Sequence, residues 1–161
     1  MCSNTAIPFD SAQTTSDPEH PHEHSLEVDI NGELQQFSFV PVSMGNPHAV
    51  IFCTDILNTD VAAIGAALTN HPAFPEGANI GFCQVVDPQF VRLRVYERGV
   101  GETRACGSGA CAAVVAARLL ERVNPKVKVS LPGGKLRIAW SDQDAPVTMT
   151  GNATLVYAAE L

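Results

Sequence analysis

Residues 105–120 read ACGSGACAAVVAARLL, and the architecture of the domain can be predicted from this segment. Its second half would be apolar on nearly every side of a helix, with Arg118 as its only charged residue. A helix that lacks a polar face has to be surrounded by protein. Most other segments read as strands, so we expect an α+β domain in which a curved, mostly antiparallel sheet or barrel wraps around one central apolar helix.

Cys106 falls at or just before the first turn of this helix, and glycines follow it at 107 and 109. A helix N-terminus carries partial positive charge and unpaired N–H groups, which stabilise a thiolate and also bind a carboxylate. The same residues would suit a small buried cysteine packed at a helix start. We favour a catalytic or ligand-contacting thiol because Glu97 and Arg98 supply charged groups just upstream.

The composition is that of an ordinary globular chain of 161 residues, with 45% hydrophobic and 17% charged residues. The net charge is −7, and the ten Lys and Arg residues form no basic stripe in the sequence, which argues against nucleic acid or an anionic membrane as partner. No apolar run approaches the roughly 20 residues that span a bilayer. We therefore expect a cytoplasmic protein with a small-molecule ligand.

Five cysteines without a CxxC pair predict reduced thiols, with neither a disulfide framework nor a zinc site. Apart from Cys106 and the uninformative Cys2, the thiols read as core residues: Cys53, Cys83 and Cys111. The alternating His20, His22 and His24 lie among Pro and Glu, where we expect solvated side chains and no metal. The glycines fit neither the Walker nor the dinucleotide pattern, which argues against a nucleotide site.

The rest of the chain is read from its periodicity. Residues 1–24 predict a flexible linker, followed by a domain at 25–161. Alternation on both sides of Asn31-Gly32, from 26 to 42, predicts a hairpin with a type I′ turn. A helix is expected at 61–68, with Asn58, Thr59 or Asp60 as N-cap. Further strands are expected at 49–52, 79–86, 90–96, 127–131, 136–140, 147–150 and 154–157.

Polar residues at the expected strand ends are candidates for the site. His48 follows Asn46 and Pro47, and a neutral histidine or the Glu97 carboxylate can take and return protons near a thiol. Asn79 can offer a donor and an acceptor to a zwitterion, or be an ordinary polar residue at a strand start. Arg98 can clamp a carboxylate with paired hydrogen bonds, or be a solvated charge.

Four blocks, taken together and in order, resemble the C-terminal half of diaminopimelate epimerase: SMGNPH (43–48), NIGF (79–82), ERGVGET (97–103) and ACGSGAC (105–111). LPGG at 131–134 and MTG at 149–151 extend the resemblance, which covers most of the chain from about residue 25 onward. It implies a cofactor-independent amino-acid epimerase that converts LL-diaminopimelate to the meso form, on the path to lysine and the bacterial cell wall.

The resemblance also implies roles for individual residues. Cys106 would be one of two opposed acid/base cysteines. The substrate's amino and carboxylate groups would be held by Asn46, Asn79, Glu97 and Arg98. Backbone N–H groups at the reacting carboxylate would come from Gly107 and Ser108. His48 and Glu97 would assist the proton traffic.

The chain departs from the family in one respect. The family inverts Cα with two cysteines from two similar domains, and the N-terminal one supplies its cysteine in a Cys-Gly-Asn-Gly type of turn, which this sequence lacks. We therefore expect a C-terminal domain whose N-terminal partner domain is missing. Such a chain should not epimerise alone, and its exposed half-interface predicts self-association into a homo-oligomer.

Two alternatives stay open. One is a related cofactor-independent racemase of the proline racemase type, which shares the two-base plan. The other is a non-catalytic binding or assembly domain that uses the helix N-terminus as an anion site.

Overall fold

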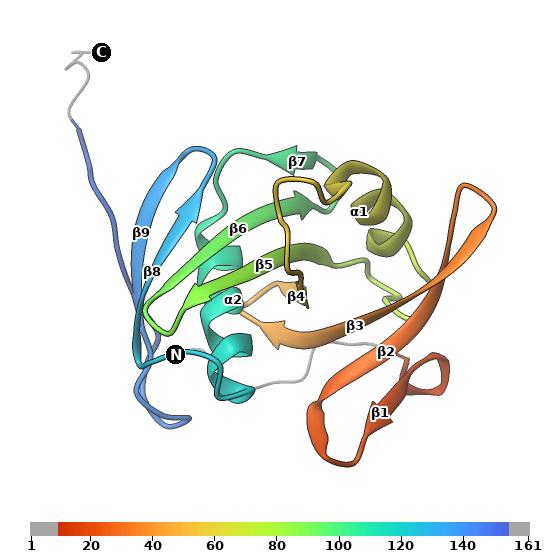
Figure 1. The fold of residues 1–161 in the computed structure, drawn as a ribbon, viewed down its shortest axis with the longest axis horizontal. Helices are drawn as coiled ribbons and strands as arrows, with labels where there is room; N and C mark the ends of the chain where they lie inside the picture. The colour runs from red at the N-terminus through yellow and green to blue at the C-terminus, as the bar shows by residue number, and fades with distance from the viewer. Residues whose placement is uncertain (1–9, 155–161) are drawn as a thin grey trace, which may run out of the picture.

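The computed structural model describes residues 10–154, which form one ten-stranded mixed sheet and two α-helices (Figure 1). The elements of the first half are η1 (Ser11–Gln13), β1 (Thr15–Asp17), β2 (His20–Ile30), β3 (Glu33–Ser43), β4 (Pro47–Phe52) and α1 (Val61–Thr69). Those of the second half are β5 (Asn79–Asp87), β6 (Phe90–Glu97), β7 (Gly101–Thr103), α2 (Gly107–Leu119), β8 (Lys126–Leu131), β9 (Gly134–Ala139) and β10 (Thr148–Thr150).

The sheet runs in the order β1-β2-β3-β4-β5-β6-β8-β9-β10, with β7 paired to β6 beside this path. Neighbouring strands are antiparallel except in two pairs, β4 with β5 and β6 with β8. Each parallel pair is joined through a helix, α1 in the first case and α2 in the second. The predicted α+β fold with a mostly antiparallel sheet is confirmed, but the sheet stays open because β1 and β10 are its two edges.

The helix α2 is enclosed by the sheet, as its sequence predicts (Figure 1). Its residues from Ala112 to Ala117 are all buried, and the alanines among them let the strands approach closely. Val95, Val129 and Ile138 of the sheet belong to the same core cluster. The sheet therefore fixes where the N-terminus of α2 lies.

The helix α1 packs on a second core cluster, separate from that of α2. Its N-cap is Asp60, one of the three predicted candidates, whose side chain accepts a hydrogen bond from the Ala63 N–H at 3.0 Å. Gly65 of this helix lies against Tyr96 of β6: a Cβ added at Gly65 would lie 2.5 Å from Tyr96 Cβ. This close approach sets the spacing between α1 and β6.

Gly65→Ala is expected to lower the free energy of unfolding by about 2 kcal/mol, because the new methyl group overlaps Tyr96. In most helix interiors the same change stabilises by about 1 kcal/mol, so the sign is diagnostic. Urea unfolding measures the change. Ala62→Gly, at an exposed position of α1, gives the propensity effect alone, and a Gly65→Ala protein more stable than the parent would contradict the packing.

The linker predicted for residues 1–24 differs from the structure at residues 15–17 and 20–24, which form strands. β1 and the first part of β2 lie within it, so the predicted boundary falls inside β2. The reason is pairing with neighbouring strands: His24 pairs with Phe39 of β3 and Ser16 of β1, and its ring lies 5.9 Å from that of Phe39. Residues 1–9 lie outside the described part.

Most other expected elements are present. The hairpin turns at Asn31 and Gly32, both with the positive φ of a type I′ turn, at 56° and 90°. The strand expected at 147–150 is β10, and most of the one expected at 154–157 lies outside the described residues. Neither described helix is long and apolar enough to cross a membrane.

Candidate active site

The predicted site residues gather where β4, β5 and β6 lie side by side. His48 of β4 is the register partner of Asn79, the first residue of β5. The Asn79 carboxamide oxygen accepts a hydrogen bond from the Arg98 N–H at 3.0 Å, and β6 ends at Glu97. Positions separated by up to 50 residues in the sequence are thus brought together by strand register.

Cys106 is the N-cap of α2, as its place before the helix predicts. Its Sγ accepts a hydrogen bond from the Gly109 N–H at 3.4 Å, and its carbonyl accepts the Ala110 N–H at 3.0 Å. The side chain is buried, with only 7% of the residue exposed. The positive end of the helix and an N–H donor therefore both face the sulfur.

A chain of polar contacts joins this sulfur to β4. Ser108 Oγ lies 3.6 Å from Cys106 Sγ and 3.2 Å from His48 Nε2, which in turn lies 3.1 Å from Asn46 Oδ1. Because an amide oxygen only accepts, Nε2 carries the hydrogen and donates. Ser108 Oγ can accept from the same N–H, which leaves its own hydrogen free to point at the sulfur.

His48 is held neutral. Burial lowers the pKa of His48 and the nearby charge of Glu97 opposes part of this shift, which leaves a pKa of about 4. Only 1% of the residue is exposed, and Nδ1 has no hydrogen-bond partner among the described residues. At neutral pH the ring acts as a fixed hydrogen-bond donor at Nε2 and adds no positive charge beside the thiol.

Asn79 and Arg98 make contacts that brace the end of the sheet. Asn79 Nδ2 donates to the Pro47 carbonyl at 3.1 Å, so its carboxamide links β4 to the residue after β6. The Arg98 guanidinium donates to the Glu76 carbonyl. These contacts fit the structural reading of both residues, and a role in ligand binding stays a prediction.

Glycines allow two close approaches around Cys106. A Cβ added at Gly109 would lie 3.1 Å from Val95 and 3.2 Å from Cys106 Sγ. The Gly133 N–H donates to the Arg104 carbonyl at 2.6 Å, and a Cβ there would lie 2.8 Å from the same oxygen. The β8–β9 turn therefore holds the loop that leads into Cys106.

Three neighbours of the site were not assigned a role from the sequence. The Thr103 hydroxyl donates to Glu97 Oε1 at 2.5 Å. Gly133 anchors the loop before Cys106, and the Met149 thioether lies 3.3 Å from where a Gly107 Cβ would stand. All three residues lie in the sequence blocks that resemble the family. Their contacts, however, follow only from the strand register and the turn geometry of the structure.

Other features of the described residues lie away from this site. No group of three or more His, Cys, Asp or Glu side chains in residues 10–154 could hold a metal ion. A groove of about 690 Å³ lies over β8, β9 and β10 and is lined by none of the predicted site residues.

The fold and the site together define an α+β domain that holds a cysteine thiol at the N-terminus of a sheet-wrapped helix. The sequence profile of one family, diaminopimelate epimerase, matches residues 40–156. The chain therefore belongs to the diaminopimelate epimerase family.

Individual relatives agree with this assignment. Proteins named diaminopimelate epimerase are 54% identical over 131 residues in Xanthomonas campestris pv. campestris and 56% over 132 residues in Coxiella burnetii. A third, from Pseudomonas aeruginosa, is 48% identical over 137 residues. These matches cover 81%, 82% and 85% of this chain but 45%, 48% and 49% of the relatives. The chain thus spans about half the length of the curated relatives it matches.

Solved structures give more distant likenesses. A probable proline racemase from Agrobacterium radiobacter, solved with bound carbonate, aligns over 80% of this chain and 47% of its own, with a TM-score of 0.49 and 9% identity. A phenazine biosynthesis protein of the PhzF family from Bacillus anthracis aligns over 78% of this chain and 39% of its own, with a TM-score of 0.47 and 17% identity.

Proposed function

We propose that this chain supplies one half of a cofactor-independent diaminopimelate epimerase site, with Cys106 as the acid/base group on one face of the substrate. The observation that carries the proposal is the position of the sulfur at the N-cap of an enclosed helix, in contact with Ser108 and so with His48. Family membership supports diaminopimelate as the substrate.

The first step is removal of the α-proton. The Cys106 thiolate takes the hydrogen from Cα and becomes a thiol, while the electron pair of the broken C–H bond stays on the substrate and spreads into its carboxylate. The N–H groups of Gly107 and Ser108, at the positive end of α2, stabilise the charge that develops there. No cofactor ring is needed to accept the electrons, provided that these donors are in place beforehand.

The second step delivers a proton to the opposite face of Cα. One thiol cannot do this, because a single base returns the proton to the face from which it came. Among the described residues only Cys106 has its thiol at a helix N-terminus. The proposal therefore includes a second acid/base cysteine from another domain, as the two-domain plan of the family implies, and closure of the two domains would exclude water.

The remaining predicted residues bind the substrate. Glu97 is proposed to hold the amino group, because only its Oε1 is engaged among the described residues and Oε2 is left for an ammonium N–H. Asn46, Asn79 and Arg98 are proposed to complete the binding of the amino and carboxylate groups. As a step toward lysine, the reaction would take place in the cytoplasm.

The test compares residues 1–161 alone with the same residues joined to the N-terminal half of the Xanthomonas campestris relative. We expect ¹H NMR to show interconversion of LL- and meso-diaminopimelate by the joined protein and none by residues 1–161. Turnover by residues 1–161 at enzyme-like rates would contradict the two-thiol proposal. A folded joined protein that binds diaminopimelate without inverting it would contradict the assignment of Cys106.

The alternatives make different predictions. A proline racemase activity would appear as inversion of proline by the joined protein in the same assay. A purely anion-binding domain would bind a dicarboxylate while its Cys106 thiol reacts no faster than a free thiol. Sedimentation of residues 1–161 tests the proposed self-association directly.

A further inference from the structure

The Glu97 carboxylate contacts the short strand β7, and other residues contact β7 on the opposite face of the sheet. β7 is only three residues long and pairs with the end of β6, Val95 with Thr103 and Tyr96 with Glu102. Successive side chains of a strand point to opposite faces. Thr103 therefore shares a face with Val95 and α2, while Glu102 shares a face with Tyr96 and α1.

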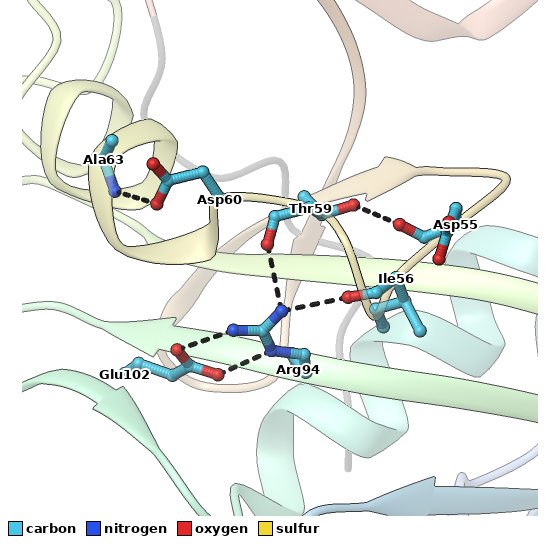
Figure 2. A network of polar contacts seen from close by, with 7 residues as sticks. All are labelled: Asp55, Ile56, Thr59, Asp60, Ala63, Arg94 and Glu102. Atoms are coloured by element: carbon cyan, nitrogen blue, oxygen red, sulfur yellow. Dashed lines mark hydrogen bonds and ion pairs between the residues drawn. The ribbon is translucent and has the colours of Figure 1, made fainter.

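On the face of α1, Arg94 clamps β7 in place (Figure 2). Its Nε and Nη2 donate to the two carboxylate oxygens of Glu102 at 2.7 and 2.9 Å. Its Nη1 donates to the carbonyls of Ile56 and Thr59 at 2.9 and 3.0 Å. Isolated surface ion pairs contribute little, but a forked arginine pair with two further backbone acceptors fixes geometry.

On the face of α2, the clamped strand presents the Thr103 hydroxyl to Glu97. The hydroxyl donates to Oε1 at 2.5 Å and occupies one of the two carboxylate oxygens. Glu97 is half-buried at the end of β6, where a glutamate side chain without partners would sample several rotamers. The hydrogen bond selects one of them and directs Oε2 away from Thr103.

We propose that Thr103 is a positioning residue that orients Glu97 for the substrate, and that the Arg94–Glu102 pair holds Thr103 in register. The inference deepens the proposed function, because the value of an oriented Glu97 rests on that function. Neither Thr103 nor Arg94 needs to touch the substrate. Both act through the carboxylate.

The main test is a double-mutant cycle on residues 1–161, with binding of LL-diaminopimelate followed by NMR. Thr103→Val keeps the branched shape and removes the hydroxyl, and we expect it to raise the Kd about tenfold. Thr103→Ser restores the hydroxyl and should return the Kd to within about twofold of the parent. In a Glu97→Gln background, Thr103→Val should cause little further loss, because Thr103 acts through Glu97.

A second readout needs no ligand. The ¹³Cδ resonance of Glu97 at pH 7 reports on the hydrogen bond to its carboxylate. The chemical shift of this resonance should change in Thr103→Val. It should also change in Arg94→Lys, which keeps the positive charge but cannot form the bidentate pair with Glu102. In Thr103→Ser the chemical shift should be unchanged. Arg92→Lys, on the same face of β6, is the matched control and should leave the resonance unchanged.

The two readouts separate the possible failures. If the parent chain does not bind diaminopimelate but the Glu97 resonance moves as expected, substrate binding by this half alone fails and the positioning role stands. If the parent binds and Thr103→Val neither moves the resonance nor weakens binding, the positioning role is overturned. An equal loss from Thr103→Val in the Glu97→Gln background would also overturn it, because Thr103 would then act by another route.

Discussion

Cys106→Ala is expected to lower the rate of Cα proton exchange by at least about a thousandfold in the protein joined to the complementary half of a relative. The proposed acid/base thiol, whose sulfur accepts the Gly109 N–H, would be lost, and the two groups linked to it are poor substitutes. Ser108 is a weak base, and the pKa of His48, lowered to about 4 by burial, leaves that ring a poor proton acceptor. Incorporation of deuterium from D₂O, followed by NMR, measures the exchange.

Cys111→Ala is the matched control for this change. Cys111 lies within α2, packed against the core and away from the helix N-terminus, so we expect exchange within about twofold of the parent. Alkylation of residues 1–161 with iodoacetamide gives an independent view of the same thiols. If Cys106 reacts no faster than Cys111 at neutral pH, the helix N-terminus does not activate the Cys106 thiol. That result would support the alternative of a non-catalytic anion-binding domain.

Acidification from pH 7 to pH 4 is expected to remove about 3 kcal/mol of stability through His48 alone. Burial lowers the pKa of His48 in the folded chain from 6.5 to about 4, with Glu97 opposing this shift. Between these values the unfolded chain binds the proton more readily, so the stability contribution is complete above about pH 6.5 and is lost as the pH falls toward 4. Urea unfolding across this range measures it.

In His48→Gln the loss of stability between pH 7 and pH 4 should be smaller by about the same 3 kcal/mol, because glutamine does not titrate. His24→Gln is the control: burial and the charge of His22 also lower the pKa of His24, but this residue of β2 is only half-buried. Carboxylates titrate in all three proteins and cancel in the comparison. Parallel stability curves for the parent and His48→Gln would show that the ring is not held neutral by its surroundings.

The sequence predicts those parts of the fold in which a residue pattern is compatible with only one local structure. A helix from 107 to 119 without a polar face has to be enclosed, and Asn31-Gly32 between alternating segments has to be a hairpin. The linker prediction missed the strands at 15–17 and 20–24 because Pro, Asp and His have a low intrinsic preference for strands, and the pairing of β2 with β1 and β3 overrides that preference.

The positions of the candidate site residues could be predicted, but their partners could not. Motif blocks singled out Cys106, His48 and Glu97, and the strand ends of β4 and β6 bring the latter two to the α2 N-terminus. The Ser108 link to His48 spans 60 residues, and the Thr103 link to Glu97 depends on the register of a three-residue strand. Such contacts follow from register, which local patterns do not determine.

The two parallel strand pairs have a consequence for how the chain reaches its native state. The hairpins β2–β3, β5–β6 and β8–β9 join neighbours in the sequence and can zip up early. Pairing β4 with β5 and β6 with β8 requires that the chain first close a long connection through a helix. The chain loses conformational entropy in this closure before the strand contacts that compensate for it can form. Refolding should therefore be limited by these two crossovers and take milliseconds to seconds, far slower than a helical bundle of this size.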